Sequence, residues 1–177
     1  MRGSREIGYV EVIAQHYPNV QVKAEGLTPS YADLLWLGGD PIPPQAELDT
    51  KLLVTKQDLV WQDIKTLRDT RLSGGFSCQG KWWHSDNERC PLYKESRIKY
   101  LGLLMLGANM PTTIYWKTMD GSFVNMTPTL AGQIFNTVAG WDTTTFTNAE
   151  QHKAAMMQVA DPFSYDYSTG WPTIYGE

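Results

Sequence analysis

Cysteine is scarce in this chain of 177 residues, which contains only Cys78 and Cys90. Two cysteines cannot form the disulfide framework that stabilises many small secreted domains, so both are interpreted as free thiols. The N-terminal segment also lacks an apolar run of signal-peptide length before Gln15 and His16. We therefore expect a protein that is made in a reducing cytosol.

Long apolar runs and clusters of basic residues are missing as well. The longest apolar stretch, residues 101–110, is interrupted by Gly102 and Gly107. It is far shorter than the roughly 20 residues of a membrane-spanning helix. The net charge is -4 with no Lys or Arg cluster, whereas non-specific nucleic-acid binding draws most of its free energy from neutralising phosphates. Neither a membrane nor a nucleic acid is an expected partner.

The usual motifs of catalysis and cofactor binding are also absent. Cys78, His84 and Cys90 are separated by five residues on each side, but a structural zinc site normally uses closely paired ligands and a fourth group. Cys78 is expected on the inward face of a hairpin, where a thiol stays protonated. No phosphate-binding glycine loop, G-x-S-x-G or H-E-x-x-H motif occurs. We expect no catalytic residue, metal or cofactor, and hence no enzyme.

Aromatic residues, in contrast, are plentiful, with seven Trp and nine Tyr. Such side chains are favoured where one end is packed and the other is wet, as at protein interfaces and glycan-facing surfaces. A core unusually rich in aromatic packing is the plainer alternative. Composition leaves both interpretations open.

The N-terminal half predicts a small α/β module followed by a long helix. Apolar residues at helical spacing predict a helix over residues 7–17, and two short strands follow within 20–23 and 31–39. From Pro44 onward no glycine or further proline interrupts a helix that extends to about residue 71. Its seven-residue recurrence fits a seam with another helix, in the same chain or in a second copy: Ala46, Leu53, Val60 and Leu67.

The C-terminal half predicts short hairpins packed with about three helices. Two strands flank Gln79-Gly80, and a hairpin with a type I′ turn is expected at Asp120-Gly121 because both residue types tolerate positive φ. Helices are expected over residues 95–108, 127–140 and 144–160. The inner face of the second would comprise Leu130, Ile134, Phe135 and Val138. The aromatic tail that follows is expected to be pinned to a surface.

The stretch His84-Ser85-Asp86 has a structural and a functional interpretation. A strand ending in Trp82-Trp83 must be followed by a turn, and Ser and Asp often cap exposed backbone N–H groups at the start of the next element. His84 could hold that turn closed. A functional site remains the alternative.

An ordered set of motifs covers residues from about 68 to 172. It comprises Gly80 with Trp82 to Asp86, Ser96-Arg97-Ile98, GLLMLGAN, WKTMDGSFVNMTP, Ala131 with Ile134-Phe135, and Ala149-Glu150 with His152 and Ala154-Ala155-Met156. This set resembles a domain of unknown function found at the C-terminal end of tail, tail-fibre and tail-fibre-associated proteins of tailed bacteriophages. The resemblance implies no catalytic residue, metal or cofactor.

Two further features bear on that resemblance. In the pattern that this set resembles, the Ser-Arg pair usually follows HSD closely. Residues 87–95, NERCPLYKE, therefore look like an insertion between the two. The N-terminal half resembles a second, small phage-tail module. The fold class is thus expected to be α+β, divided into an N-terminal α/β module (5–43), a linking helix (44–71) and a C-terminal domain (72–177).

These observations favour a non-enzymatic structural or adaptor component of a phage virion, made in the host bacterial cytoplasm and acting through other phage structural proteins. A homo-oligomer is expected, with a trimer as the first choice. One alternative is a tail-fibre assembly chaperone that is absent from the mature virion, and another is a receptor-binding module for host glycan. The candidate interaction surface comprises Trp83, Leu53, Val60, Trp61, Trp171 and Tyr175.

Overall fold

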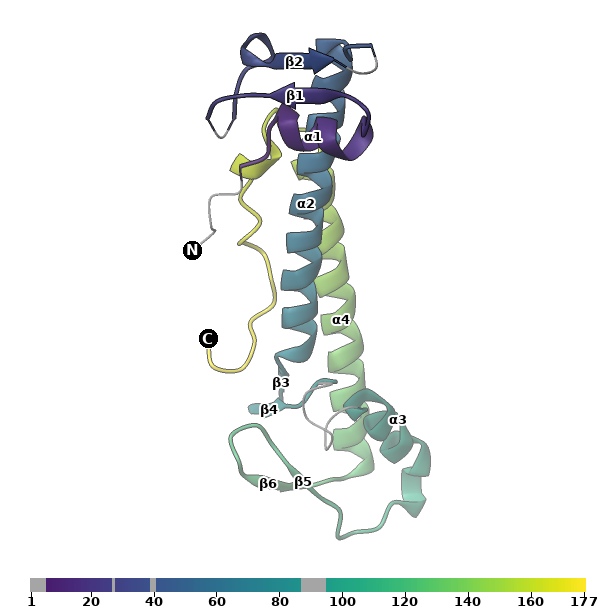
Figure 1. The fold of residues 1–177 in the computed structure, drawn as a ribbon. Helices are drawn as coiled ribbons and strands as arrows, with labels where there is room; N and C mark the ends of the chain where they lie inside the picture. The colour runs from purple at the N-terminus through teal and green to yellow at the C-terminus, as the bar shows by residue number, and fades with distance from the viewer. Residues whose placement is uncertain (1–5, 27, 39–40, 87–94) are drawn as a thin grey trace. The chain divides into compact units, whose positions relative to one another are not determined.

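The computed structural model describes residues 6–26, 28–38, 41–86 and 95–177, in two compact units (Figure 1). The first unit comprises Met1–Asp63 and Lys153–Asp166, and the second comprises Ile64–His152 and Tyr167–Glu177. Within the described residues, four α-helices accompany three two-stranded antiparallel sheets. This confirms an α+β fold with short hairpins packed against helices. The three-part division at residues 43 and 71 stays a prediction.

The first unit begins with helix α1 (Tyr9–His16), strand β1 (Gln21–Lys23), a 3₁₀ turn (Tyr31–Asp33) and strand β2 (Leu35–Gly38). The two strands are antiparallel, with Val22 opposite Trp36. Their inner side and one face of α1 meet the first turns of helix α2 (Gln45–Ser73), as Figure 1 shows. The small core consists of Val12, Ile13, Leu34 and Leu48.

Two tyrosines fasten α1 to the start of α2. The Tyr9 hydroxyl donates to Asp49, and the Tyr17 hydroxyl donates to Glu47 Oε1 at 2.5 Å. Burial and the neighbouring Glu47 carboxylate raise the pKa of Tyr17 to about 12. Burial, the hydrogen bond to Asp49 and its charge also raise the pKa of Tyr9. Both phenols are thus held in their neutral, hydrogen-bond-donating form.

Helix α2 confirms the long helix expected from the uninterrupted sequence, and it contributes residues to both units. Within the first unit, Lys56 pairs with Asp161 at 3.1 Å, and the Lys153 ammonium lies 4.7 Å from the centre of the Trp61 ring. Val60 is buried, while Leu53 is exposed. The seven-residue recurrence therefore marks positions of very different exposure along this helix.

The second unit starts with a hairpin of strands β3 (Phe76–Cys78) and β4 (Lys81–Trp83). Both turn residues have positive φ, 52° for Gln79 and 70° for Gly80, which is the backbone of a two-residue type I′ turn. Phe76 and Cys78 both point into the core, as the alternation predicted. The hairpin thus delivers Trp83 to the core and places residues 84–86 directly after it.

Helix α3 (Ser96–Leu106) is followed by strands β5 (Tyr115–Lys117) and β6 (Phe123–Asn125). The predicted hairpin exists, but the type I′ assignment at Asp120-Gly121 is wrong. Gly121 has a φ of 85°, whereas Asp120 has none of the positive φ that such a turn requires at both positions. The strands are joined instead by a three-residue loop, closed by the Thr118 amide donating to the Ser122 carbonyl at 2.9 Å.

The helices expected over residues 127–140 and 144–160 form one helix, α4 (Pro128–Met156), which contributes to both units. Thr127 caps it as predicted, because its hydroxyl accepts the Leu130 amide at 3.2 Å. Where a break was expected, the hydroxyls of Thr143, Thr144 and Thr145 bond to carbonyls four residues earlier. This pairing is compatible with a continuous helix. Ile134 and Val138 are buried, with Leu130 partly buried.

The C-terminal tail, residues 167–177, packs on the second unit rather than extending into solvent. Trp171 stacks on His152 with ring centres 5.5 Å apart, and the Tyr175 amide donates to the Gly74 carbonyl at 3.1 Å. Arg71 pairs with Glu177 at 2.5 Å, and this hydrogen bond lowers the pKa of Glu177. These contacts confirm that the aromatic tail is pinned to a surface.

Candidate functional site

The stretch after β4 is held tightly by backbone contacts. The Ser85 hydroxyl accepts the Gly75 amide at 3.0 Å, and the Tyr100 hydroxyl of α3 donates to the His84 carbonyl at 2.9 Å. Just before it, the Trp83 indole N–H donates to the Cys78 carbonyl at 2.8 Å, which closes the β3–β4 hairpin from inside. Ser85 and Trp83 are both buried. The expected strand end is therefore confirmed, while the continuation of the expected turn beyond Asp86 lies outside the described residues.

Asp86 caps helix α3 from ten residues away. One carboxylate oxygen accepts the Arg97 amide at 3.0 Å, in the first turn of the helix, and the other lies 3.2 Å from the Arg97 guanidinium. The residue immediately before the helix, Glu95, makes no side-chain cap of its own. A carboxylate at a helix N-terminus also lies at the positive end of the helix dipole. The predicted capping role of Asp86 is confirmed.

Arg97 joins this turn to helix α4. Its Nε and Nη2 donate to the two carboxylate oxygens of Asp142 at 2.8 and 2.6 Å, the bidentate geometry of a strong arginine–carboxylate pair. Nη2 also lies 3.3 Å from the Leu72 carbonyl at the end of α2. Burial alone would lower the pKa of Arg97, but the hydrogen bonds and charges of Asp142 and Asp86 raise it overall. We call Ser85, Asp86, Arg97, Tyr100 and Asp142 the motif cluster.

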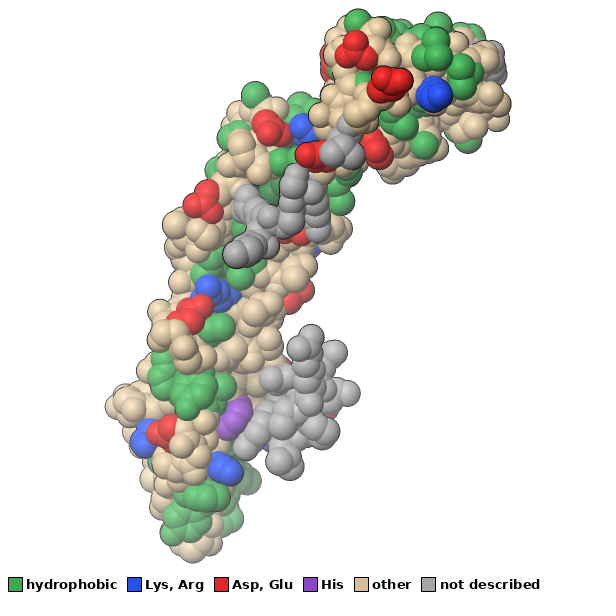
Figure 2. Space-filling view, turned by 60° about the vertical axis from the view of Figure 1, so that its left-hand side comes forward, with side chains coloured by type: hydrophobic (Ala, Val, Ile, Leu, Met, Phe, Trp, Pro, Cys, Tyr) green, Lys and Arg blue, Asp and Glu red, His purple; other side chains and the backbone are tan. Residues whose placement is uncertain are grey.

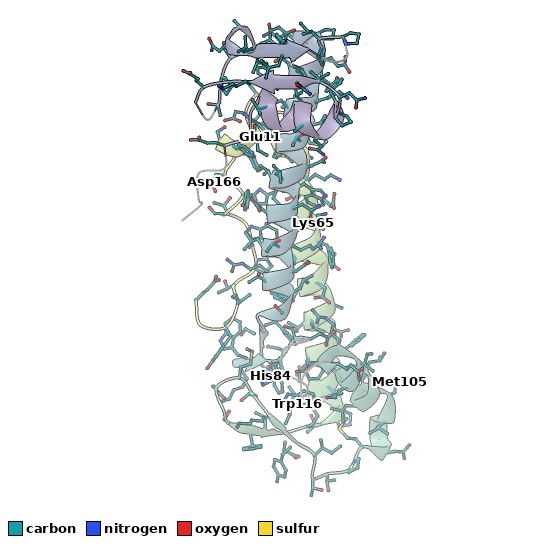
Figure 3. All side chains as sticks on the ribbon, viewed as in Figure 1. Glu11, Lys65, His84, Met105, Trp116 and Asp166 are labelled. Atoms are coloured by element: carbon teal, nitrogen blue, oxygen red, sulfur yellow. The ribbon has the colours of Figure 1, made fainter. Side chains whose placement is uncertain are left out.

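His84 lies in the second unit, directly before Ser85 in the chain (Figure 3). Burial lowers the pKa of its imidazole, and the charge of Lys117 lowers it further. The ring is therefore held towards its neutral form.

The motif cluster has the chemistry of a structural joint. The Ser85 hydroxyl receives an amide, and the carboxylates of Asp86 and Asp142 accept from Arg97, so these side chains are occupied by internal bonds. Cys78 is buried, with the Thr137 hydroxyl 3.3 Å from its sulfur. Within the described ranges, no group of three His, Cys, Asp or Glu side chains is placed to hold a metal ion. Cys90, and with it the Cys78-His84-Cys90 alternative, lies outside the described residues.

The six predicted interaction residues differ widely in their exposure to solvent. Trp83 and Val60 are buried within the chain, so placing them on a surface was wrong for this structure. Trp61 and Trp171 are partly covered by Lys153 and His152 respectively. The Tyr175 ring packs near Trp82, 5.9 Å between centres, and Leu53 and Tyr175 retain 37% and 41% exposure. A role for the exposed members stays a prediction.

Sequence reasoning missed several residues that matter to this region. Asp142 was not singled out, although it provides the principal partner of Arg97 from 45 residues away. The most exposed aromatics of the second unit, Tyr115 at 64% and Phe123 at 68%, were also missed. The sequence could have predicted their exposure, because strand side chains alternate between faces and Trp116 and Val124 take the inward positions. Nothing local in the sequence pairs Arg97 with Asp142.

The fold and its motif cluster define an α+β domain in which the partly buried Arg97 joins helix α3 to helix α4. The chain belongs to the family described as Domain of unknown function (DUF4376), which matches residues 55–169. That description states no function, so the phage-tail resemblance stays a prediction. Comparison of the chain with curated proteins and with solved structures finds no match. Across the described part of the chain, no helix is both long and apolar enough to span a membrane.

Proposed function

We propose that this chain is a non-enzymatic structural or adaptor component of a tailed-phage virion, associated with the tail or tail fibre and acting through protein–protein contacts. The observation that carries the proposal is the contrast between occupied polar groups and exposed apolar ones in the second unit. The polar side chains of the motif cluster are hydrogen-bonded within the chain, whereas large apolar side chains reach the surface (Figure 2). Exposed large apolar side chains, rather than a site with free polar groups, support protein docking as the mode of action.

The resemblance of the ordered motifs to phage-tail domains supplies the phage context. The test is mass spectrometry of purified particles produced by the phage or prophage that encodes the chain. Peptides from both units at structural stoichiometry are expected. Peptides found only in the infected-cell lysate would sink the virion proposal and favour the tail-fibre assembly chaperone.

A receptor-binding module for host glycan is the second candidate, and one observation favours it. Tyr115 and Phe123 project from the outer face of the β5–β6 hairpin, where aromatic rings could stack on the apolar faces of sugars. Binding on a glycan array that is lost in both Tyr115→Ala and Phe123→Ala would support this candidate. A uniformly blank array for the folded wild-type protein would remove it.

A further inference from the structure

The C-terminal tail, residues 167–177, is bound by the second unit in the way that a peptide ligand would be (yellow in Figure 1). It contains neither helix nor strand. The rest of the second unit is one continuous segment, residues 64–152, whereas the residues that lead into the tail, 153–166, belong to the first unit. The tail therefore completes the second unit through long-range contacts alone.

Helix α4 holds the first part of the tail. His152 stacks on the Trp171 ring, 22° from parallel, and its Nε2 lies 2.9 Å from the Thr169 carbonyl. The Asn148 side-chain amide donates to the same carbonyl at 3.3 Å. A Cβ added at Gly170 would lie 2.7 Å from Asn148 Oδ1, so the tail backbone comes close to the helix here. This helix thus contacts both an aromatic ring and the bare backbone of the tail.

The end of helix α2 holds the last part of the tail. A Cβ added at Gly74 would lie 2.7 Å from the Ile174 side chain. Gly74 does not have a positive φ, so the space taken by Ile174, rather than the backbone conformation, accounts for this glycine. The Arg71 guanidinium donates to the Pro172 carbonyl at 3.4 Å and to the Glu177 carboxylate at 2.5 Å. Shape and charge therefore both fit this part of the tail.

We propose that the surface beneath the tail is a docking groove for the tail of a second copy of this chain, so that two copies exchange tails. The groove offers four contacts: a stacking ring for Trp171, bare backbone for Ile174, an aromatic neighbour for Tyr175 and a guanidinium for Glu177. The tail of a second copy has the same sequence and makes the same contacts. Each copy then gives one tail and receives one, which is a low-cost route to a symmetric dimer.

The connection to the tail allows this exchange. Residues 165–168 form neither helix nor strand, so the tail leaves the groove without breaking an element of secondary structure. Thr169, Tyr175 and Glu177 are exposed even when the tail is bound, as expected of a segment that opens while the core stays folded.

Protein concentration decides which tail fills the groove. Within one chain, a short flexible connection gives the tail an effective concentration on the order of millimolar. The dilute wild-type protein therefore keeps its own tail, and crowded copies exchange theirs. This inference concerns self-association and does not depend on the phage assignment.

Two full-length variants separate the tail from the groove. Gly74→Val blocks the groove where Ile174 binds and keeps an intact tail, whereas Trp171→Ala weakens the tail and keeps an intact groove. Each variant alone should stay monomeric. An equal mixture should form a one-to-one dimer, at least about tenfold more tightly than either variant self-associates, because neither chain's own tail competes well for the intact groove. Analytical ultracentrifugation with one chain fluorescently labelled measures this association.

A fluorescein-labelled synthetic peptide of residues 167–177 tests the groove itself. Fluorescence anisotropy should show that it binds the Trp171→Ala chain at least about tenfold more tightly than the wild-type chain, whose own tail competes. The Gly74→Val chain should not bind it. Arg71→Glu repels Glu177 without adding bulk beside Ile174, so it is the second groove variant and should also weaken peptide binding. Circular dichroism checks that each variant keeps its helices.

Three results would overturn the proposal. The first is a mixture of Gly74→Val and Trp171→Ala chains that sediments as two monomers. The second is self-association of either variant as tight as that of the mixture, which would place the contact elsewhere. The third is peptide binding that neither Gly74→Val nor Arg71→Glu weakens.

Discussion

The two units use polar side chains in opposite ways. In the first unit, Tyr9 and Tyr17 bond to carboxylates of α2 at an exposed edge beside a core of four buried residues. In the second unit, the Arg97–Asp142 pair is largely enclosed and lies beside a larger, aromatic core. Exposed polar bonds contribute little stability, whereas breaking an enclosed ion pair is costly. The second unit should therefore be far more sensitive to single polar substitutions.

The units also differ in the charge of their surfaces. Asp and Glu side chains gather over the N-terminal elements of the first unit, as the face drawn in Figure 2 shows. The second unit balances its charges in pairs such as Lys81 with Asp120 at 3.0 Å. Hydrogen bonds from Ser122, Thr118 and Lys81 lower the pKa of Asp120 and keep this pair ionised. Added salt should therefore screen the repulsion between carboxylates of the first unit, and should change the stability of the second unit less.

Replacing Trp83 by alanine should have the largest effect. Its side chain is fully buried, and its indole N–H is bonded to the Cys78 carbonyl, so the change removes a core ring together with this hydrogen bond. We expect a loss of about 3–5 kcal/mol in the free energy of unfolding, measured by chemical denaturation. Trp82→Ala, at the half-buried neighbouring position, is the control and should cost clearly less. Equal losses of stability in the two variants would contradict the expectation that Trp83 contributes more to the core than Trp82.

Replacing Asp142 by alanine should come next. Arg97 would keep its charge in a site where its side chain is 22% exposed, but it would lose its bidentate partner. We expect a loss of about 2–4 kcal/mol in the free energy of unfolding. Asp69→Ala removes the partner of Arg68 at a far more exposed position and should change stability by less than about 1 kcal/mol. Similar losses in both variants would erase the proposed difference between enclosed and exposed pairs.

Replacing Ile13 by valine probes the small core of the first unit. Ile13 is fully buried, and the change deletes one methylene. A loss of about 1 kcal/mol is expected for such a deletion. Hydrogen exchange should show the effect in α1 and β1 and leave β3 and β4 unchanged. Faster exchange in β3 and β4 of the same size would show that the two units are not independent in stability.

Alkaline titration should give the smallest and most local effect. The pKa of Tyr17 is raised in the folded state from 10.0 to about 12. The contribution of this raised pKa to stability is complete below pH 10 and is lost as pH rises through about 12. Loss of α1 signals in that window is expected by NMR, and it should be weaker in Tyr17→Phe. An unchanged alkaline transition in Tyr17→Phe would contradict this assignment.

Local patterns predicted much of this fold because local chemistry decides it. The Gln79-Gly80 turn and the long helix without glycine both follow from residues close together in the chain. The single helix α4 was not predicted, because a break was expected between residues 140 and 144, whereas the hydroxyls of Thr143 and Thr144 bond within a continuous helix. Asp120 and Gly121 are residue types that favour a type I′ turn, but a three-residue loop accommodates the same two residues.

The long-range part of the motif cluster was beyond sequence reasoning for a different reason. Any of several acidic residues could have paired with Arg97, and only the packing of α3 on α4 selects Asp142. The Gly74-Gly75 pair shows the same limit. A Cβ at Gly74 would lie 2.7 Å from Ile174, so this glycine makes room for a tail a hundred residues further on. Single-sequence patterns carry no signal for such contacts.

The central claim is that the motif cluster holds the second unit together. Amide hydrogen exchange on Asp142→Ala, compared with the wild-type protein, tests this claim most directly. We expect faster exchange in α3 and in the β3–β4 hairpin, because Arg97 no longer joins them to α4, with α1 and β1 unchanged. Exchange identical to wild type throughout α3 and β3–β4 would contradict the account and reopen a functional role for the cluster.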